Sequence, residues 1–347
     1  MHSGSILIKV FMSTRNLSSL SYSILDLATV IEGKTAADTF KRSVDVARHA
    51  EDWGYERYWF AEHHNMISVA SSATSLLIGH IAEKTTKIRV GSGGIMLPNH
   101  SPLVIAEQFG TLATLYPDRI DLGLGRAPGS DQLTAMAIRG DRFNAANDFP
   151  TDVRKLQLYL SDENKNAKVR AIPGEGTNVP IWILGSSTDS AHLAAAYGLP
   201  YAFASHFAPQ QFLNAIKIYR ANFKPSAALQ QPYVMACVNV VVADTDQEAE
   251  RLSTSLKQLF IGIVTGQRKL LQEPVQSMEG IWDDMQEEAV QQMLAVSLIG
   301  GKETVKEDLQ SFLAQTGVDE IMATSHIYDH TARLYSYQLF ADIIKGK

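Results

Sequence analysis

The sequence predicts an α/β fold in which eight parallel strands close into a (β/α)8 barrel with loop insertions at its C-terminal face. Short apolar runs alternate along the chain with amphipathic stretches of helical length. This alternation indicates parallel strands joined by right-handed crossovers. Eight strand candidates are each followed by a helical stretch, and eight such units is the number that closes a barrel. An open doubly wound sheet is the alternative.

The predicted elements follow from this alternation. The strands are predicted at 20–28, 55–64, 87–94, 119–129, 179–187, 199–207, 233–244 and 319–327. The first helix, 36–54, places Phe40, Val44 and Ala47 on one face, and Gly54 ends it. The other helices are predicted at 71–85, 102–116, 189–198, 208–223, 246–316 and 329–344, with a polar, weakly patterned stretch at 140–178.

The composition is typical of a soluble globular enzyme. The chain has 347 residues, of which 45% are hydrophobic and 20% are charged. Length alone suggests two domains, but α/β barrels commonly use about 250 residues or more as one domain. We therefore expect a single barrel domain over residues 21–347, preceded by a poorly specified N-terminal extension over residues 1–20.

Charge and cysteine content limit the partners and the compartment. The net charge of -6 is spread along the chain without a basic stripe, so nucleic acid is not an expected partner. No stretch approaches transmembrane length, so no membrane association is expected. The one cysteine, Cys237, lies in an apolar run, where a buried, inert thiol is expected. A chain with one cysteine forms no internal disulfide, which fits the cytoplasm.

Polar residues and glycines gather where the predicted strands end. In a barrel, the C-terminal ends of the strands form one mouth that carries the chemistry. We therefore expect the following residues to surround one site: Asp26, Glu62, His63, His64, Gly93, Gly94, Arg126, Ser186, Ser187 and His206. For the acidic residues Asp26 and Glu107, binding of backbone amides is an equally good interpretation.

The stretch WILGSSTDSAHLAAAYG predicts an anion-binding site. A strand ends at Gly185 and an Ala-rich helix begins after the serines, so backbone N–H groups and hydroxyls meet at the mouth. Arg126 lies at another strand end, where a guanidinium suits a phosphate. The alternatives are that Ser187 only caps the helix, and that Arg126 only pairs with a loop carboxylate.

Two other motifs resemble known binding sites but do not have the spacing that those sites require. In LGLGRAPG the third glycine, Gly129, comes one position too late for a dinucleotide-binding fingerprint. Glu62, His63 and His64 suggest zinc, but no further ligand set follows at matching spacing, so no metal is expected. A histidine at the mouth is better suited to donate a hydrogen bond or to carry a proton. The alternative is that one of the two histidines only caps backbone groups of the loop.

The third predicted strand has glycine, and therefore no side chain, at Gly91, Gly93 and Gly94. Glycine inside a strand costs stability and marks a bend or a close approach by another group. A β-bulge at the barrel rim is the structural interpretation. The functional interpretation is a flat ligand that lies against bare backbone.

Three long stretches together resemble the luciferase-like flavin monooxygenases, close to their single-chain bacterial branch. They are AEHHNMISVASSATSLLIGHIA, VGSGGIMLPNHSPLVIAEQFGTLATLYPDRIDLGLGRAPGSD and WILGSSTDSAHLAAAYGLPYAFASHFAP. The resemblance runs from about residue 21 to the C-terminus. It implies a barrel that binds reduced FMN, supplied by a separate NAD(P)H-dependent flavin reductase, and uses O2 to oxidise a small organic substrate. A homodimer is expected by resemblance only.

The resemblance also implies roles for single residues. His63 matches the family's catalytic histidine, with His64 beside it. Gly93–Gly94 matches a non-proline cis peptide under the flavin ring, and Glu107 matches a position whose backbone touches the flavin. The other residues that the resemblance places at the cofactor are Asp26, Arg126, Gly185, Ser186, Ser187 and Ser190, of which the arginine and the serines match the phosphate site.

One position departs from the family pattern, and two other functions stay open. The heterodimeric light-emitting enzymes have a reactive cysteine where this chain has Gly125, so light emission is not implied. The alternatives are a hydride-transfer enzyme that uses a deazaflavin or FMN without oxygen, and a flavin-binding protein without turnover. The segments 140–178 and 266–280 are long enough to cover the mouth as a lid.

Overall fold

All strands in the described part of the chain form one parallel sheet that closes on itself. The computed structural model describes residues 17–140 and 145–347. Its strands are β1 Ser21–Asp26, β2 Arg57–Phe60, β3 Arg89–Met96, β4 Ile120–Gly125, β5 Ile181–Gly185, β6 Tyr201–Phe203, β7 Val234–Val242, β8 Ser297–Gly300 and β9 Glu320–Thr324. Pairing runs from β1 through β7 and returns through β9 to β1. The predicted (β/α)8 barrel is therefore confirmed, and the open sheet is excluded.

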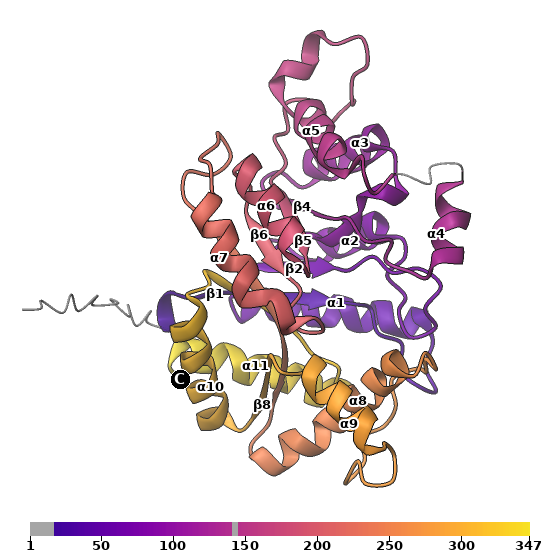
Figure 1. Cartoon of the computed structure of the whole chain (residues 1–347), viewed down its shortest axis with the longest axis vertical. Helices are drawn as coiled ribbons and strands as arrows, with labels where there is room; N and C mark the ends of the chain where they lie inside the picture. The colour runs from indigo at the N-terminus through magenta and orange to yellow at the C-terminus, as the bar shows by residue number, and fades with distance from the viewer. Residues whose placement is uncertain (1–16, 141–144) are drawn as a thin grey trace, which may run out of the picture.

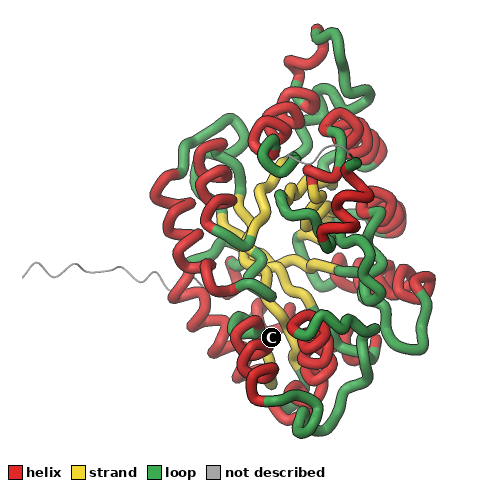
Figure 2. The backbone as a smooth tube through the Cα atoms, turned by 45° about the vertical axis from the view of Figure 1, so that its right-hand side comes forward, coloured by secondary structure: helices red, strands yellow, loops and turns green. Residues whose placement is uncertain are grey.

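Helices cover the outside of the barrel, as Figure 2 shows with red helices around yellow strands. The α-helices in the described residues are α1 Ala36–Asp52, α2 Thr74–Lys84, α3 Pro102–Leu115, α4 Gln132–Arg139, α5 Phe149–Leu160, α6 Thr188–Tyr197, α7 Phe212–Asn222, α8 Asp246–Val264, α9 Asp284–Met293, α10 Lys302–Thr316 and α11 His330–Lys345. The first helix shows why they form. Thr35 and Asp38 make a capping box at its start, and Val46 and Ala50 are buried on one face.

The hydrophobic core has an inner and an outer part. The larger part lies between the strands and the helices and includes Ile24, Tyr58 and Phe340. A smaller cluster fills the barrel interior and consists of Leu25, Trp59, Ala61, Trp182, Ala202, Met235, Cys237 and Met322. Burial raises the pKa of the Cys237 thiol well above its ordinary value, as expected for an inert cysteine.

Charged side chains close the N-terminal end of the barrel. Arg57 donates to Asp121 at 2.9 Å and to Glu320 at 3.0 Å, and all three residues are at or next to the first residue of a strand. Arg89 donates to the other oxygen of Asp121 at 2.6 Å. Tyr233 donates to Glu320 at 2.9 Å. We refer to Arg57, Arg89, Asp121 and Glu320 as the base network.

Two elements differ from the sequence prediction. The stretch 246–316 is not one helical region, because it contains α8, α9, α10 and the strand β8. β8 pairs only with the second half of β7, Asn239–Val242, and lies outside the barrel. The polar stretch 140–178 contains the helix α5, whose apolar face buries Phe149, Val153 and Leu156.

The start of the chain joins the barrel earlier than predicted. Residues 1–16 of the predicted extension lie outside the described residues. Leu17 and Leu20, however, are buried in the hydrophobic core. Within the described residues, no helix is both long enough and apolar enough to cross a membrane. Figure 1 shows the order of the helices around the barrel, with α8 and α9 at the opposite end of the view from α5.

Candidate active site

A cavity of about 380 Å³ lies at the C-terminal ends of the strands. Its walls come from residues that end or follow β1 to β6, together with the segment that leads into α5. The predicted site residues that line it are Glu62, His63, Gly93, Gly94, Arg126, Gly185, Ser186, Ser187, Ser190 and His206. Segments far apart in sequence therefore meet in one place, as expected for the mouth of a barrel.

His63 and His64 have different surroundings. The strand β2 ends at Phe60, so both histidines lie in the loop that follows it. His63 lines the cavity, and its Nδ1 lies 3.3 Å from the carbonyl oxygen of Gly129. Burial lowers the pKa of His63, so its imidazole is neutral at pH 7. His64 does not line the cavity, because its Nε2 bonds to Glu62 at 2.8 Å.

Glu62 holds the loop that carries both histidines. It is buried and accepts hydrogen bonds from His64, from His100 at 2.9 Å and from the backbone N–H of Met96 at 3.0 Å. Burial by itself raises the pKa of Glu62, but the hydrogen bonds from His100 and His64 lower it to about 2. The carboxylate therefore joins the loops after β2 and β3. Sequence reasoning did not identify His100 as a partner.

The Gly93–Gly94 peptide is cis and forms part of the cavity wall, as the resemblance implied. The structure adds a reason for the glycines that sequence reasoning missed. A Cβ on Gly93 would lie 2.7 Å from Leu25 Cδ1, and one on Gly94 would lie 2.7 Å from the carbonyl oxygen of Gly123. The backbone contact requires a glycine at position 94 independently of any ligand, whereas the atom beside Gly93 is the end of a flexible side chain that itself lines the cavity.

Polar groups gather where β5 leads into α6. Ser186, Ser187 and Ser190 line the cavity. Ser187 is the N-cap residue of α6, but its side chain makes no capping hydrogen bond. The hydroxyl of Ser190 donates to the carbonyl oxygen of Ser187 at 2.7 Å. The start of a helix with several hydroxyls suits an anion.

Arg126 lies beside these serines and already has an acidic partner. Its guanidinium donates to Asp189 at 3.0 Å, and both side chains are largely exposed. This is the alternative weighed from the sequence, although the carboxylate lies in the first turn of α6 and not in a loop. Asp189 also lines the cavity, so any anion bound there would compete with it for Arg126.

Two predicted cofactor residues and His64 lie away from the cavity. Asp26 is buried and accepts hydrogen bonds from Ser43 at 2.6 Å and from Arg333 at 3.2 Å. Burial raises the pKa of Asp26, but the charge of Arg333 and these hydrogen bonds lower it overall. Glu107 is half-buried in α3 and does not line the cavity. Both acidic side chains are therefore outside the walls of the cavity.

The two predicted lid segments differ in their relation to the cavity. Ala146, Phe149 and Pro150, at the start of α5, form part of its wall. The segment 266–280 contributes instead to a more open pocket of about 590 Å³ that shares His63 with the cavity. Only the segment before α5 therefore covers the cavity directly.

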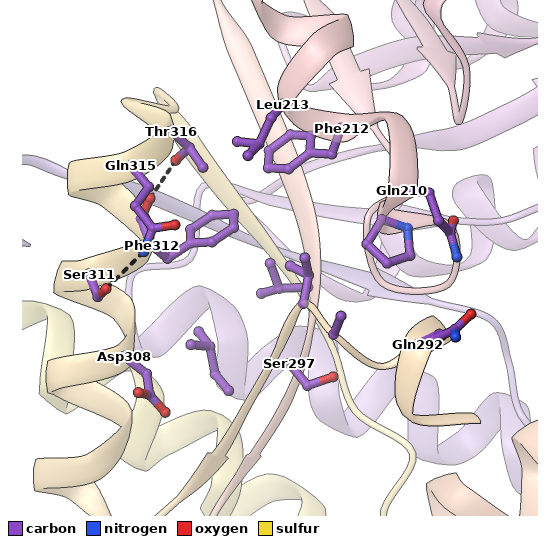
Figure 3. A pocket seen from close by; sticks show the side chains of 15 residues that line it. Gln210, Phe212, Leu213, Gln292, Ser297, Asp308, Ser311, Phe312, Gln315 and Thr316 are labelled. Atoms are coloured by element: carbon purple, nitrogen blue, oxygen red, sulfur yellow. Dashed lines mark hydrogen bonds between the residues drawn. The ribbon is translucent and has the colours of Figure 1, made fainter. Parts of the chain in front are cut away.

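A different groove of about 670 Å³ lies outside the barrel, between α7, α10 and β8. Figure 3 shows Phe212 of α7 and Phe312 of α10 in this groove, where their rings stack with centroids 5.8 Å apart. Asp308 is the only acidic residue among its lining residues, which include no histidine, arginine or lysine. The groove therefore lacks the chemistry of the cavity at the mouth. Within the described residues, no group of three or more acidic, histidine or cysteine side chains has the arrangement of a metal site.

Comparison with known proteins places the chain in a family. The model of the luciferase-like monooxygenase family matches residues 9–320. A luciferase-like monooxygenase of Escherichia coli (strain K12) is 52% identical over 325 residues, which cover 94% of this chain and 97% of the relative. An N-acetyl-S-alkylcysteine monooxygenase of Bacillus subtilis (strain 168) is 32% identical over 93% of this chain and 97% of the relative.

A solved structure agrees with the sequence relatives. The crystal structure of apo-MsnO8 matches with a TM-score of 0.84 and 35% identity, over 93% of this chain and 98% of that chain. The family model and these relatives each span almost the whole barrel, including the strand ends that form the cavity. This chain therefore belongs to the luciferase-like monooxygenase family.

Proposed function

We propose that this protein is a monooxygenase that uses reduced FMN and O2 to oxidise a small organic substrate, with the reduced flavin supplied by a separate NAD(P)H-dependent flavin reductase. One observation carries this proposal. A single cavity contains a neutral histidine, a wall of bare backbone at Gly93–Gly94, and a group of serines with Arg126 at a helix start.

The cavity suits a flavin that carries a phosphate. Apolar side chains of Leu25, Leu27, Leu184 and Met96 line it beside the bare backbone, which suits a flat aromatic ring. In the proposed arrangement, Ser186, Ser187 and Ser190 bind the phosphate with Arg126.

Relatives support FMN more strongly than a deazaflavin. The oxygenating constituent of 3,6-diketocamphane monooxygenase shares the fold at 18% identity and was solved with FMN. An F420-dependent secondary alcohol dehydrogenase shares it at 13% identity. The relatives from Escherichia coli at 52% identity and from Bacillus subtilis at 32% identity are both named as monooxygenases, which favours the oxygen-dependent reaction. The oxygenase component of a trigonelline monooxygenase from Acinetobacter baylyi, 20% identical, supports a separate reductase.

The residues of this chain provide binding, proton transfer and exclusion of water. Bound reduced FMN would supply the reaction with O2. His63 is held by the carbonyl oxygen of Gly129 and is neutral at pH 7, so it can accept or donate a proton at the cavity. Phe149 and Pro150 cover part of the cavity and limit access of water.

Flavin binding under anaerobic conditions tests this function. We expect reduced FMN to bind in the micromolar range and more tightly than oxidised FMN, and we expect substrate-dependent oxygen uptake when a flavin reductase and NADH are present. If reduced FMN binds no better than about millimolar, the proposal is wrong. Flavin binding and turnover without any oxygen uptake would favour hydride transfer.

The variant His63→Ala separates catalysis from binding. We expect it to keep FMN affinity and to lose about 100-fold or more in coupled substrate oxidation, because a positioned acid or base contributes about 100- to 10,000-fold. His64→Ala is the matched control, since His64 does not line the cavity. If both variants lose the same activity, His63 has no separate role. The predicted homodimer and the cytoplasmic location stay predictions, to be checked by light scattering and cell fractionation.

A further inference from the structure

His206 has hydrogen-bonding capacity that the described protein residues do not use. It follows β6, lines the cavity and is 7% exposed. Its Nδ1 is fully buried and has no hydrogen-bond partner among the described residues. Buried polar groups in proteins are nearly always hydrogen-bonded, so an unpaired one needs an explanation.

The position of His206 in the barrel relates it to His63. The barrel strands run in the order β1 to β7 and then β9, so β2 and β6 are four strands apart and lie on opposite sides. His63 follows β2 and His206 follows β6, and both line the same cavity. The two rings therefore belong to opposite walls of the space that a ligand would occupy.

The loop that carries His206 is firmly held. Asn239 on β7 donates to the carbonyl oxygen of His206 at 2.6 Å, and Ser205 donates to the carbonyl oxygen of Cys237 at 2.6 Å. The ring of Phe207 packs edge-on against the imidazole, with centroids 4.9 Å apart. The backbone around His206 is thus anchored to β7, so its unpaired nitrogen is not explained by a loosely held loop.

The imidazole is uncharged across the physiological range. Burial is the main cause that lowers the pKa of His206 to about 3, with smaller contributions from His326 and His63. A neutral imidazole has one N–H donor and one acceptor nitrogen, and it cannot form an ion pair with a carboxylate or phosphate. Its partner is therefore a group that donates or accepts a hydrogen bond.

We propose that His206 is a ligand-contacting residue that hydrogen-bonds a polar group of the ligand inside the cavity, opposite His63. This inference rests on the proposed function, because it requires the cavity to be the binding site. The polar edge of a flavin ring and a carbonyl group of the organic substrate have this chemistry in common.

Thermal unfolding of the ligand-free protein gives the first test. We expect His206→Phe to raise Tm by about 1 to 3 °C, because it removes an unpaired buried polar atom. The matched control is His326→Phe. His326 is also buried and has a lowered pKa, but its Nδ1 has a partner, Thr29 Oγ1 at 3.3 Å, and its ring does not line the cavity. We expect the control to lower Tm.

Ligand binding gives the second test. Ring ¹⁵N shifts of His206 are recorded while the protein is titrated with oxidised FMN, and separately with cyclohexanone, with and without FMN. Methylenecyclohexane, which lacks the carbonyl oxygen, is the control probe. A shift with FMN assigns the partner to the flavin edge, and a shift with cyclohexanone alone assigns it to the substrate. The probe that shifts the ring ¹⁵N signal of His206 should bind about 3- to 10-fold more weakly to His206→Phe than to the wild type. His206→Gln should recover part of this affinity.

The outcomes separate this inference from the proposed function. If FMN binds to the wild type but neither FMN nor cyclohexanone moves the His206 signal, the inference is wrong and the function stands. A fall in Tm for His206→Phe, equal to that of His326→Phe, also overturns it. If reduced FMN does not bind at all under anaerobic conditions, the proposed function fails, and the cyclohexanone titration without FMN still decides the role of His206.

Discussion

The two ends of the barrel use buried polar groups in opposite ways. At the N-terminal end, the carboxylates of Asp121 and Glu320 are fully buried, and arginine or hydroxyl donors surround them. At the C-terminal mouth, the atoms His206 Nδ1, Asn239 Oδ1 and Ser325 Oγ are buried without hydrogen-bond partners among the described residues. The base network is thus complete without a ligand, while the mouth is not.

This difference separates stability from function within one fold. A buried charge that loses its partner is costly, so the base network resists change. An unpaired buried polar group costs stability unless a ligand completes it. We therefore expect substitutions at the base to act on unfolding, and substitutions at the mouth to act mainly on binding and turnover.

The largest expected effect is at the base. Arg57→Ala leaves Asp121 and Glu320 without their shared cation, and we expect it to reduce the free energy of unfolding by about 3 to 5 kcal/mol. Urea unfolding measures this change. Arg251→Ala, at an exposed pair with Glu248 on α8, is the matched control and should cost less than about 1 kcal/mol. Equal losses in the two variants would remove the distinction between the base network and a surface pair.

Substitution of Glu62 tests whether a polar group near the mouth can act on stability and not only on binding and turnover. Its pKa is lowered to about 2 in the folded protein, below the ordinary value of 4.5. The stability that it contributes is therefore fully present above about pH 4.5, and it is lost as pH falls toward 2. We expect the free energy of unfolding of the wild type to exceed that of Glu62→Gln by about 2 to 3 kcal/mol at pH 7. This difference should disappear at low pH.

Chemical unfolding from pH 7 down to pH 3 measures this difference. Glu288→Gln on the exposed side of α9 is the control, and its free energy of unfolding should equal that of the wild type at every pH. A difference between wild type and Glu62→Gln that does not change with pH would mean that the Glu62 charge is not stabilising. In that case the loop after β2 would depend on packing alone.

The smallest expected effect is at the serine end of the cavity. Asp189→Asn removes the carboxylate that forms an ion pair with Arg126, so the guanidinium becomes available to a phosphate. We therefore expect FMN affinity to rise about 2- to 4-fold. Riboflavin, which lacks the phosphate, should bind the variant and the wild type equally. Flavin fluorescence measures both affinities. An equal gain for riboflavin would mean that Arg126 does not contact the phosphate.

Sequence reasoning predicted most of the fold because the strands and helices follow clear periodicities. It missed β8, since Ser297–Gly300 is a four-residue apolar run beside helical patterns and pairs only with the outer half of β7. It also missed α5, because a short amphipathic helix in a polar region has a weak pattern. Both elements depend on tertiary contacts.

The candidate site was predicted in outline, because strand ends identify the mouth of a barrel. Ten predicted site residues line one cavity. Spacing alone did not separate the two adjacent histidines, and only the resemblance singled out His63. Their different contacts, with Gly129 for His63 and with Glu62 for His64, depend on how the loops fold. The pairing of Arg126 with Asp189 and the unpaired nitrogen of His206 depend on distances between side chains from different strands.

The position of β8 indicates where this architecture tolerates changes in chain length. β7 pairs with β9 through Met235–Asn239 and with β8 only through Asn239–Val242, so barrel closure does not require β8. Insertions or deletions between α8 and β8 therefore leave the barrel pairings intact. Chimeras that exchange residues 272–296 should therefore keep the barrel pairings, while Leu271 stays in place because it pairs with Ile31.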